Sequence, residues 1–387
     1  MTNTQNTAGA IKTILSEKDL NTNTDFWIEK LNAVTPHDVE LALKKPAGIY
    51  DVEKLTALIS PAAENYLEQM AQLAHKLTIQ RFGKTIKLYA PLYLSNYCVN
   101  SCLYCGFNRK TDFQRTRLTI EQALKEADII ASEGFTDLLL VSSEDKQFIT
   151  TDYLCELAKE LRKKFSFLSI EIYQAEKEDY AKLFKAGIEG VTLYQETYDS
   201  AAYAAYHPAG PKSDYEKRLT APDDMASAGM RQIGLGSLLG LTDWRLETLA
   251  LAEHAHYLMK HYWKSQISFS FPRLRPAYEV EKNIYDHLIS DKNLAQMIMA
   301  LRLCFADAGL VLSTRESAHL RDNFVNLGIT RISAGSKTNP GGYADEKTSV
   351  KQFEVDDDRT PKQISEMLEA KGFDPVWKDW DASFIAD

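Results

Sequence analysis

From about residue 84 onward, short apolar runs alternate with segments whose apolar residues recur every three or four positions. The apolar runs predict eight β-strands, at residues 86–94, 137–141, 169–173, 191–194, 232–236, 266–270, 309–313 and 330–333. The periodic segments predict helices at 119–132, 151–165, 176–185, 215–228, 243–261, 293–308 and 317–326. Eight alternating strand–helix units predict a parallel (β/α)8 TIM-type barrel, an α/β fold with reactive groups at the carboxyl ends of the strands.

The two flanks of this barrel pattern, assigned to residues 84–336, are interpreted as extensions that cover the barrel. Residues 1–83 are predicted to be a helical N-terminal extension, in which residues 65–77 carry an amphipathic helix. Residues 337–387 are predicted to be a C-terminal extension. Within it, the acidic run 356–358 before Pro361 predicts a solvated helix start, and residues 372–380 predict an apolar end-piece.

The net charge of −9 disfavours nonspecific binding to nucleic acid or to an acidic membrane. The polar N-terminus lacks the apolar core of a signal peptide, and no apolar run approaches the roughly 20 residues of a membrane helix. We therefore expect a soluble, cytoplasmic protein. A reducing compartment suits free cysteines.

Three cysteines follow the first predicted strand with the spacing C-x3-C-x2-C: Cys98, Cys102 and Cys105. Three thiolates this close can hold three irons of a 4Fe-4S cluster and leave the fourth iron open. A zinc site would need a fourth ligand nearby, and the nearest histidines, His75 and His207, are distant in sequence. The spacing resembles that of the radical S-adenosylmethionine (SAM) superfamily, which implies that SAM binds the open iron through its amino and carboxyl groups.

Polar residues at the strand ends are the candidates for cofactor binding. Tyr104 is placed to lay its ring against adenine or simply to pack. Ser143 and Glu144 stand where the superfamily has a Gly-Gly-Glu-like motif, and they suit the SAM ammonium or, alternatively, a loop turn. Glu171 and Glu196 need partners inside a barrel, either ribose hydroxyls, a substrate ammonium or a salt bridge such as one to Arg218.

The fifth strand ends in the glycine-rich run 234–240, which matches neither a dinucleotide-binding fingerprint nor a P-loop. Glycines there allow the backbone to approach a flat adenine, and the superfamily resemblance implies adenine contact at this strand end. The candidate cofactor-binding set is completed by Arg218, Gly236 and Leu238.

Three arginines, Arg273, Arg275 and Arg315, follow the sixth and seventh strands, where a planar guanidinium suits a substrate carboxylate or a rim salt bridge. The histidines at 254, 256 and 261 are interpreted as a solvated helix face and not as a metal site. Cys155 and Cys304 are interpreted as small buried hydrophobic residues on helices.

Several segments together resemble the aromatic amino acid lyases of the radical SAM superfamily, in particular the tyrosine lyases that supply 2-iminoacetate for thiazole formation in thiamine biosynthesis. The segments are residues 91–98, 270–276, 312–316, 333–336, 340–343 and 375–380. A sister family that matures FeFe-hydrogenase carries further C-terminal cysteines, whereas no cysteine follows Cys304 here.

The resemblance implies that a 5′-deoxyadenosyl radical made from SAM takes hydrogen from the amino group of L-tyrosine. Cleavage of the Cα–Cβ bond then gives p-cresol and 2-iminoacetate. It further implies that Arg315 binds the tyrosine carboxylate with Ser333 nearby, that a thiazole synthase subunit receives the product, and that reduced flavodoxin or ferredoxin supplies electrons. Two alternatives remain open: a radical SAM lyase acting on tryptophan or another small amino acid, and a noncatalytic iron–sulfur or zinc scaffold.

Overall fold

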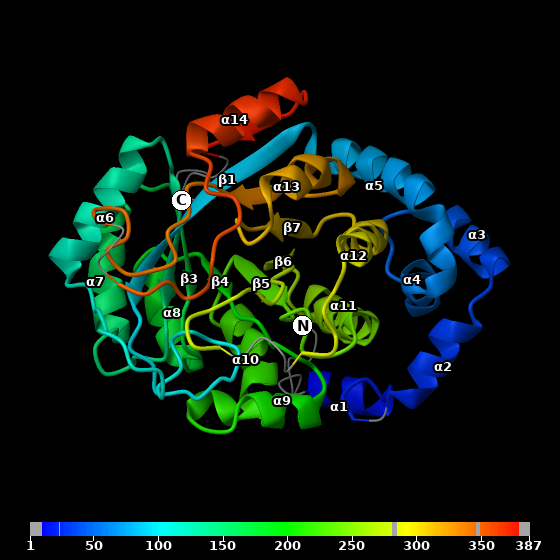
Figure 1. The fold of residues 1–387 in the computed structure, drawn as a ribbon, viewed down its shortest axis with the longest axis horizontal. Coiled ribbons are helices and arrows are strands. Elements are labelled where there is room, and N and C mark those ends of the chain that lie inside the picture. The colour runs from blue at the N-terminus through cyan, green and yellow to red at the C-terminus, as the bar shows by residue number, and fades with distance from the viewer. Residues whose placement is uncertain (1–9, 23, 281–284, 346–348, 379–387) are drawn as a thin grey trace, which may run out of the picture.

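A computed structural model describes residues 10–22, 24–280, 285–345 and 349–378 of the chain. Eight parallel strands close into a barrel, because β1 pairs with both β2 and β8 (Figure 1). The strands are β1 (Thr85–Ser95), β2 (Asp137–Ser142), β3 (Phe167–Glu171), β4 (Gly190–Thr192), β5 (Gln232–Gly236), β6 (Gln266–Ser270), β7 (Gly309–Leu312) and β8 (Arg331–Ser333). The predicted (β/α)8 fold is confirmed, although β3 begins and ends two residues earlier than predicted.

Strand alternation sorts the side chains of β1 into two cores. Leu88 and Leu92 belong to the large core that includes residues of the surrounding helices, and both are fully buried. Tyr89 and Tyr93 belong to a smaller cluster with Leu139 and other residues of β2 and β7. The side chains of this second cluster face the barrel interior. Tyr89, Tyr93 and Leu139 line a cavity there.

The barrel helices are α6 (Ile120–Ser132), α7 (Thr151–Leu161), α8 (Lys177–Lys185), α9 (Ser200–Tyr206), α10 (Tyr215–Ser227), α11 (Trp244–His261), α12 (Asp291–Cys304) and α13 (Ala318–Phe324). The predicted threonine cap of α6 is present, since Thr119 and Gln122 form a reciprocal capping box. The sequence analysis missed α9, whose seven residues are too few to show a helical period.

The N-terminal helices wrap one side of the barrel (blue in Figure 1): α1 (Ala10–Glu17), α2 (Asp25–Ala33), α3 (Pro36–Lys44), α4 (Val52–Ile59) and α5 (Leu67–Phe82). Helices α4 and α5 pack on α12, while α1 and α4 pack on α11. The prediction of a solvated histidine face on α11 is therefore wrong for His254, which is buried and hydrogen-bonds through Nδ1 to the Tyr198 hydroxyl at 2.9 Å. Burial also lowers the pKa of His254 to about 3, so its imidazole stays neutral.

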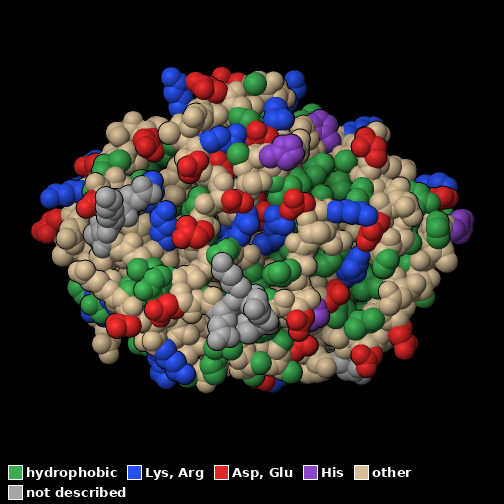
Figure 2. Space-filling view, in the orientation of Figure 1, with side chains coloured by type: hydrophobic (Ala, Val, Ile, Leu, Met, Phe, Trp, Pro, Cys, Tyr) green, Lys and Arg blue, Asp and Glu red, His purple; other side chains and the backbone are tan. Residues whose placement is uncertain are grey.

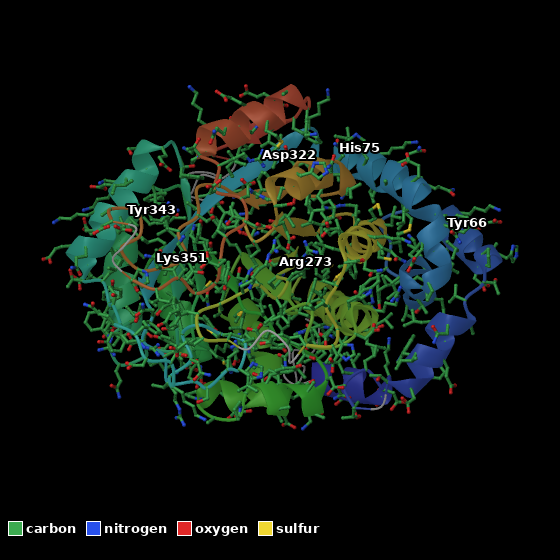
Figure 3. All side chains as sticks on the ribbon, viewed as in Figure 1. Tyr66, His75, Arg273, Asp322, Tyr343 and Lys351 are labelled. Atoms are coloured by element: carbon green, nitrogen blue, oxygen red, sulfur yellow. The ribbon has the colours of Figure 1, made fainter. Side chains whose placement is uncertain are left out.

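The C-terminal segment returns to the barrel and ends in α14 (Pro361–Ala370) and β9 (Asp374–Val376). Strand β9, which the sequence analysis did not predict, pairs in parallel with the start of β1 through Thr85 and Asp374. Tyr343, labelled in Figure 3, donates its hydroxyl hydrogen bond to the Pro91 carbonyl at 2.8 Å. Residues 379 and 380 of the predicted apolar end-piece lie outside the described residues.

The solvated helix start predicted before α14 is correct for Asp356 and Asp358, which are exposed, but wrong for Asp357. Asp357 is 1% exposed and forms ion pairs with Arg321 and with Arg359, the latter at 2.8 Å. The guanidinium of Arg321 also donates a hydrogen bond to the Ser333 carbonyl. The buried carboxylate thus joins α13, β8 and the C-terminal extension, and burying a charge in this way requires such partners.

Replacing Asp357 with alanine is expected to lower the free energy of unfolding by about 3–5 kcal/mol, because the buried Arg321 loses its partner. Urea unfolding followed by circular dichroism measures the change. Asp322, which pairs with the same Arg359 at 2.7 Å but is 28% exposed, provides the control. Asp322→Ala should cost at most about 1 kcal/mol, and equal losses in the two variants would contradict this account.

Among the described residues, no helix is both long and apolar enough to cross a lipid bilayer.

Candidate active site

The loop that follows β1 brings its three cysteines to one cavity at the barrel mouth, which all three thiols line. Burial raises the pKa of Cys102 to about 12 and that of Cys105 to about 11, and it also raises the pKa of Cys98. Iron binding must therefore displace the thiol protons, because the thiolate is the metal ligand.

The donor set consists of three thiols, and thiolates are the usual protein ligands of iron–sulfur clusters. In the part of the chain that the structure describes, no three cysteine, histidine or carboxylate side chains are grouped to hold one metal ion. In a 4Fe-4S cluster each thiolate binds a different iron, so three separated thiols around one cavity fit.

Residues 206–212, here called the brace, are hydrogen-bonded to the backbone of the cysteine loop. The backbone N–H groups of Ser101 and Leu103 donate to the carbonyls of Ala209 and Tyr206, at 2.9 and 3.1 Å. Gly210 has φ +101° and lies close to the buried Asn100. A Cβ atom added to Gly210 would lie only 2.7 Å from the Cα atom of Asn100. The brace therefore fixes the backbone that carries the cysteines, and the sequence analysis missed it because it has no periodic pattern.

A histidine of the brace holds Tyr104. The His207 Nε2 atom lies 2.7 Å from the Tyr104 hydroxyl, and its Nδ1 atom lies 2.7 Å from the Tyr203 carbonyl. Nδ1–H therefore donates to the carbonyl, and Nε2 accepts from Tyr104. Burial lowers the pKa of His207 to about 3, which keeps this neutral tautomer in place. Tyr104 lines the cavity, and its stacking on adenine stays a prediction.

The predicted ammonium-binding residues after β2 also line the cavity. The Ser143 hydroxyl bonds the backbone carbonyls of Ser95 and Tyr97, which is the loop-turn role named as the alternative. Glu144 accepts a hydrogen bond from the Asn100 amide at 3.2 Å. The carboxylate thus faces the cysteine loop, where a ligand ammonium would meet it.

Glu196 forms the internal ion pairs that the sequence analysis named as an alternative to ligand binding. Its Oε1 lies 2.5 Å from Lys212 Nζ and 3.6 Å from an Arg218 nitrogen. Burial alone would raise the pKa of Glu196, but the cations of Lys212 and Arg218 lower it, so the carboxylate is ionised. All three side chains line the cavity, and the sequence analysis missed Lys212.

Glycine at the end of β5 has a packing reason. A Cβ atom on Gly236 would lie 2.7 Å from the Tyr194 ring and 2.9 Å from the Ser270 carbonyl. The side chain of Leu238, two residues later, lines the cavity, while its N–H donates to the Glu196 carbonyl at 2.7 Å. Adenine contact at this strand end stays a prediction.

A second cavity continues inward and shares Tyr93, Glu171, Arg315 and Phe353 with the first. The Arg315 guanidinium stacks 3.4 Å from the centre of the Phe353 ring. Its remaining contact is a 3.5 Å hydrogen bond to the Arg273 carbonyl, and it forms no ion pair with any described residue. Its charge also acts on Glu171, which lines the same two cavities. A cation that lines this chamber without an ion pair fits an anionic group of a ligand.

The other two candidate arginines form salt bridges at the rim of the barrel. Arg273, labelled near the centre of Figure 3, pairs with Glu316 and, at 2.7 Å, with Asp291. Arg275 pairs with Asp356 at 2.9 Å. Figure 2 shows basic and acidic side chains gathered near the middle of this face of the molecule. Arg273 and Arg275 thus form ion pairs and Arg315 does not, a difference that the sequence could not reveal.

Ser333 lines the inner cavity, and its hydroxyl is hydrogen-bonded to the backbone of Thr314. Its hydroxyl accepts a hydrogen bond from the Thr314 N–H at 3.1 Å, so it holds the backbone directly before Arg315. The structure supports a positioning role for this serine.

The C-terminal extension completes the mouth with two residues that the sequence analysis missed. The Gln352 amide nitrogen lies 4.0 Å from the Cys105 sulfur, and its amide oxygen accepts a 2.8 Å hydrogen bond from Tyr93. Phe353 lies beneath Arg315. No local pattern marks these loop residues, because their positions depend on the chain returning across the barrel.

Glu171 lies at the junction of the two cavities, and burial raises its pKa to about 7, against the opposing effect of Arg315. The folded state therefore holds this proton more tightly than the unfolded chain, so its contribution to stability is present below about pH 4.5 and is lost as the pH rises to about 7. Glu171→Gln should flatten this part of the stability curve of the apoprotein by about 1–3 kcal/mol.

Thermal unfolding between pH 4.5 and 8 tests the Glu171 prediction. The control is Glu178→Gln, which changes an exposed carboxyl on α8 and should leave the slope intact. An unchanged slope in Glu171→Gln would refute the assignment.

A parallel barrel with three cysteines in the loop after its first strand defines a radical SAM enzyme. In agreement, residues 92–252 match the Radical SAM superfamily, and residues 270–374 match the Biotin and Thiamin Synthesis associated domain. The chain is 43% identical to the 2-iminoacetate synthase of Salmonella typhimurium, over 94% of this chain and 98% of that protein. It is 44% identical to the 2-iminoacetate synthase of Escherichia coli, over 91% of this chain and 93% of that protein. The chain belongs to the 2-iminoacetate synthase family and is a carbon–carbon lyase.

Among solved structures, the chain is similar to HydG, a maturase of the FeFe-hydrogenase, with a TM-score of 0.88 and 34% sequence identity. That match covers 94% of this chain and 80% of the HydG chain. Enzymes of the radical SAM family use a 4Fe-4S cluster and SAM, and the three cysteines described above are the residues that fit the cluster.

Proposed function

We propose that this chain cleaves the Cα–Cβ bond of L-tyrosine to 2-iminoacetate and p-cresol and supplies thiazole formation in thiamine biosynthesis. The observation that carries the proposal is the guanidinium of Arg315, which has no ion pair with a described residue and lies where the inner chamber meets the cysteine cavity. An amino acid anchored there through its carboxylate would present its amino group toward the cavity that the thiols line. The family relation to 2-iminoacetate synthases supports the substrate.

The residues have separate roles in this proposal. Cys98, Cys102 and Cys105 hold the cluster, Arg315 binds the tyrosine carboxylate, and Ser333 positions the backbone before Arg315. SAM is bound by residues that line or adjoin the outer cavity: Tyr104, Ser143, Glu144, Glu171, Glu196, Arg218, Gly236 and Leu238. When bound, the reduced cluster and SAM supply the carbon radical that takes a hydrogen atom from the substrate. The chamber inside the barrel would hold the reacting atoms in a fixed arrangement.

The proposal includes a cytoplasmic location and two partners, a thiazole synthase subunit that receives the product and a reduced flavodoxin or ferredoxin. It also divides the chain into a helical extension (1–83), the barrel (84–336) and a C-terminal extension (337–387). The contribution of Gln352 and Phe353 to the mouth supports treating the last part as a cover of the barrel.

Anaerobically reconstituted protein, incubated with tyrosine, SAM and dithionite, should form p-cresol and 5′-deoxyadenosine in parallel. Liquid chromatography with mass detection measures both products. Tryptophan, offered alone, should give neither product. Formation of 5′-deoxyadenosine with tryptophan, but not with tyrosine, would overturn the substrate assignment while leaving the radical SAM class intact.

A further inference from the structure

The loop between β1 and α6 exposes apolar side chains next to the cluster cysteines. Val99, between Cys98 and Asn100, is 50% exposed, and Leu103, next to Cys102, is 41% exposed. Tyr97, on the other side of Cys98, is 36% exposed. Apolar groups gathered on a short surface loop are a usual feature of interaction sites.

The same loop is basic in an acidic protein. Residues 96–117 contain four cations, of which Arg117 pairs with Asp145, and one carboxylate, whereas the whole chain has a net charge of −9. Arg109 and Lys110 are exposed, and the Arg109 N–H donates to the Asn100 carbonyl at 2.9 Å. The Asn108 amide donates to the Cys102 carbonyl at 3.0 Å. These bonds hold the backbone at residues 108 and 109 against Asn100 and Cys102, which are the chain neighbours of the exposed Val99 and Leu103.

Arg115 makes this surface rigid. Its guanidinium donates to the backbone carbonyls of Asn96, Phe107, Asn108 and Thr111, at 2.6–3.0 Å. One side chain thus ties both ends of the loop together around the cysteines. A surface held in this way needs little ordering when a partner docks, which lowers the cost of association.

We propose that the surface formed by Tyr97, Val99, Leu103, Arg109 and Lys110, here called the donor face, docks a small acidic protein that carries a one-electron centre. The inference rests on the proposed function, which consumes one electron for each SAM that is cleaved. In the docked complex the donor centre loses one electron and the cluster gains one, with no bond formed or broken between the proteins. The inner side of the cysteine loop faces the barrel cavity, where SAM and the substrate bind in the proposed function. An electron from another protein therefore has its shortest path to the cluster through the outer side of this loop.

The composition of the donor face favours this partner over a second copy of the chain. Two copies meeting through it would bring cations against cations, which is repulsive. An acidic donor would be steered toward the cations, and a few exposed apolar side chains are enough for the small, transient interfaces of redox partners.

The test compares two reductants on the reconstituted holoenzyme and follows 5′-deoxyadenosine. With purified reduced flavodoxin or ferredoxin at low salt, the double variant Arg109→Glu/Lys110→Glu should turn over about 10- to 100-fold more slowly than the wild type. With dithionite, which needs no docking site, the same variant should stay within twofold of the wild type. Added salt should slow the flavodoxin-driven wild type and leave the variant largely unaffected.

A matched control reverses another pair of adjacent exposed cations, Lys163→Glu/Lys164→Glu, which follows α7 at the amino-terminal end of the barrel strands. This control should behave as the wild type with both reductants. The apolar part of the donor face is tested by Val99→Ser, with Trp263→Ser, 78% exposed before β6, as its control.

Equal losses with flavodoxin and dithionite in the donor-face variants would overturn the proposal, because they would show damage to the cluster loop. A wild type that accepts dithionite but neither protein donor would overturn it as well. Failure of the proposed function gives a different result: 5′-deoxyadenosine forms without p-cresol, and the comparison of reductants can still be read.

Discussion

Replacing Cys102 with alanine should reduce 5′-deoxyadenosine and p-cresol formation below detection and remove most of the bound iron. Cys102 is 6% exposed and lines the cavity at the barrel mouth together with Cys98 and Cys105. With two thiolates left, a 4Fe-4S cluster loses one of its three protein ligands. Without the cluster, SAM has no iron to bind and cannot be cleaved. Iron analysis and the visible absorption of anaerobically reconstituted protein measure the loss.

The chain offers two cysteine controls for this experiment. Cys304 is fully buried at the end of α12, where it packs in the large core, and Cys155 is partly buried on α7. Cys155→Ala and Cys304→Ser should keep the wild-type iron content, although the second variant is expected to lose some stability. Full iron in Cys102→Ala, or loss of iron in Cys155→Ala, would show that the ligand assignment is wrong.

Replacing Arg315 with methionine should lower kcat/KM for tyrosine by about 10²-fold, mainly through a higher KM. The guanidinium forms no ion pair with a described residue, although its charge lowers the pKa of the nearby Glu171, so the loss reports mainly on the ligand. Truncating one partner of a buried charge pair costs about 2–5 kcal/mol, which corresponds to this range. Lysine at this position should recover only part of the activity, because a point charge cannot replace a planar fork.

Arg275→Met is the matched control, since Arg275 lies in the same cavity wall but already pairs with Asp356 at 2.9 Å. It should change kcat/KM for tyrosine by no more than several-fold. Cluster content and the rate of 5′-deoxyadenosine formation at saturating tyrosine should remain near the wild type in Arg315→Met. If Arg275→Met has the larger effect on KM, the carboxylate is bound elsewhere.

The sequence alone determined the barrel and predicted the cluster ligands. The bounds of β5 and β6 were predicted to the residue, because in each strand two apolar residues alternate with polar residues or glycine, which is a local pattern. The C-x3-C-x2-C spacing predicted Cys98, Cys102 and Cys105 as ligands, and residues seven positions apart or less need no long-range contact to meet at one cavity. These are local properties of the chain, and local patterns are what a sequence displays directly.

Only the tertiary structure decided which polar residues are available to a ligand. Arg273, Arg275 and Arg315 look alike in the sequence, yet two of them are paired with carboxylates from distant segments. Lys212 and Gln352 reach the mouth through loops without any periodic pattern. The charge state and exposure of a side chain depend on every segment packed around it, and those contacts join residues far apart in the chain, so they arise only when the fold closes.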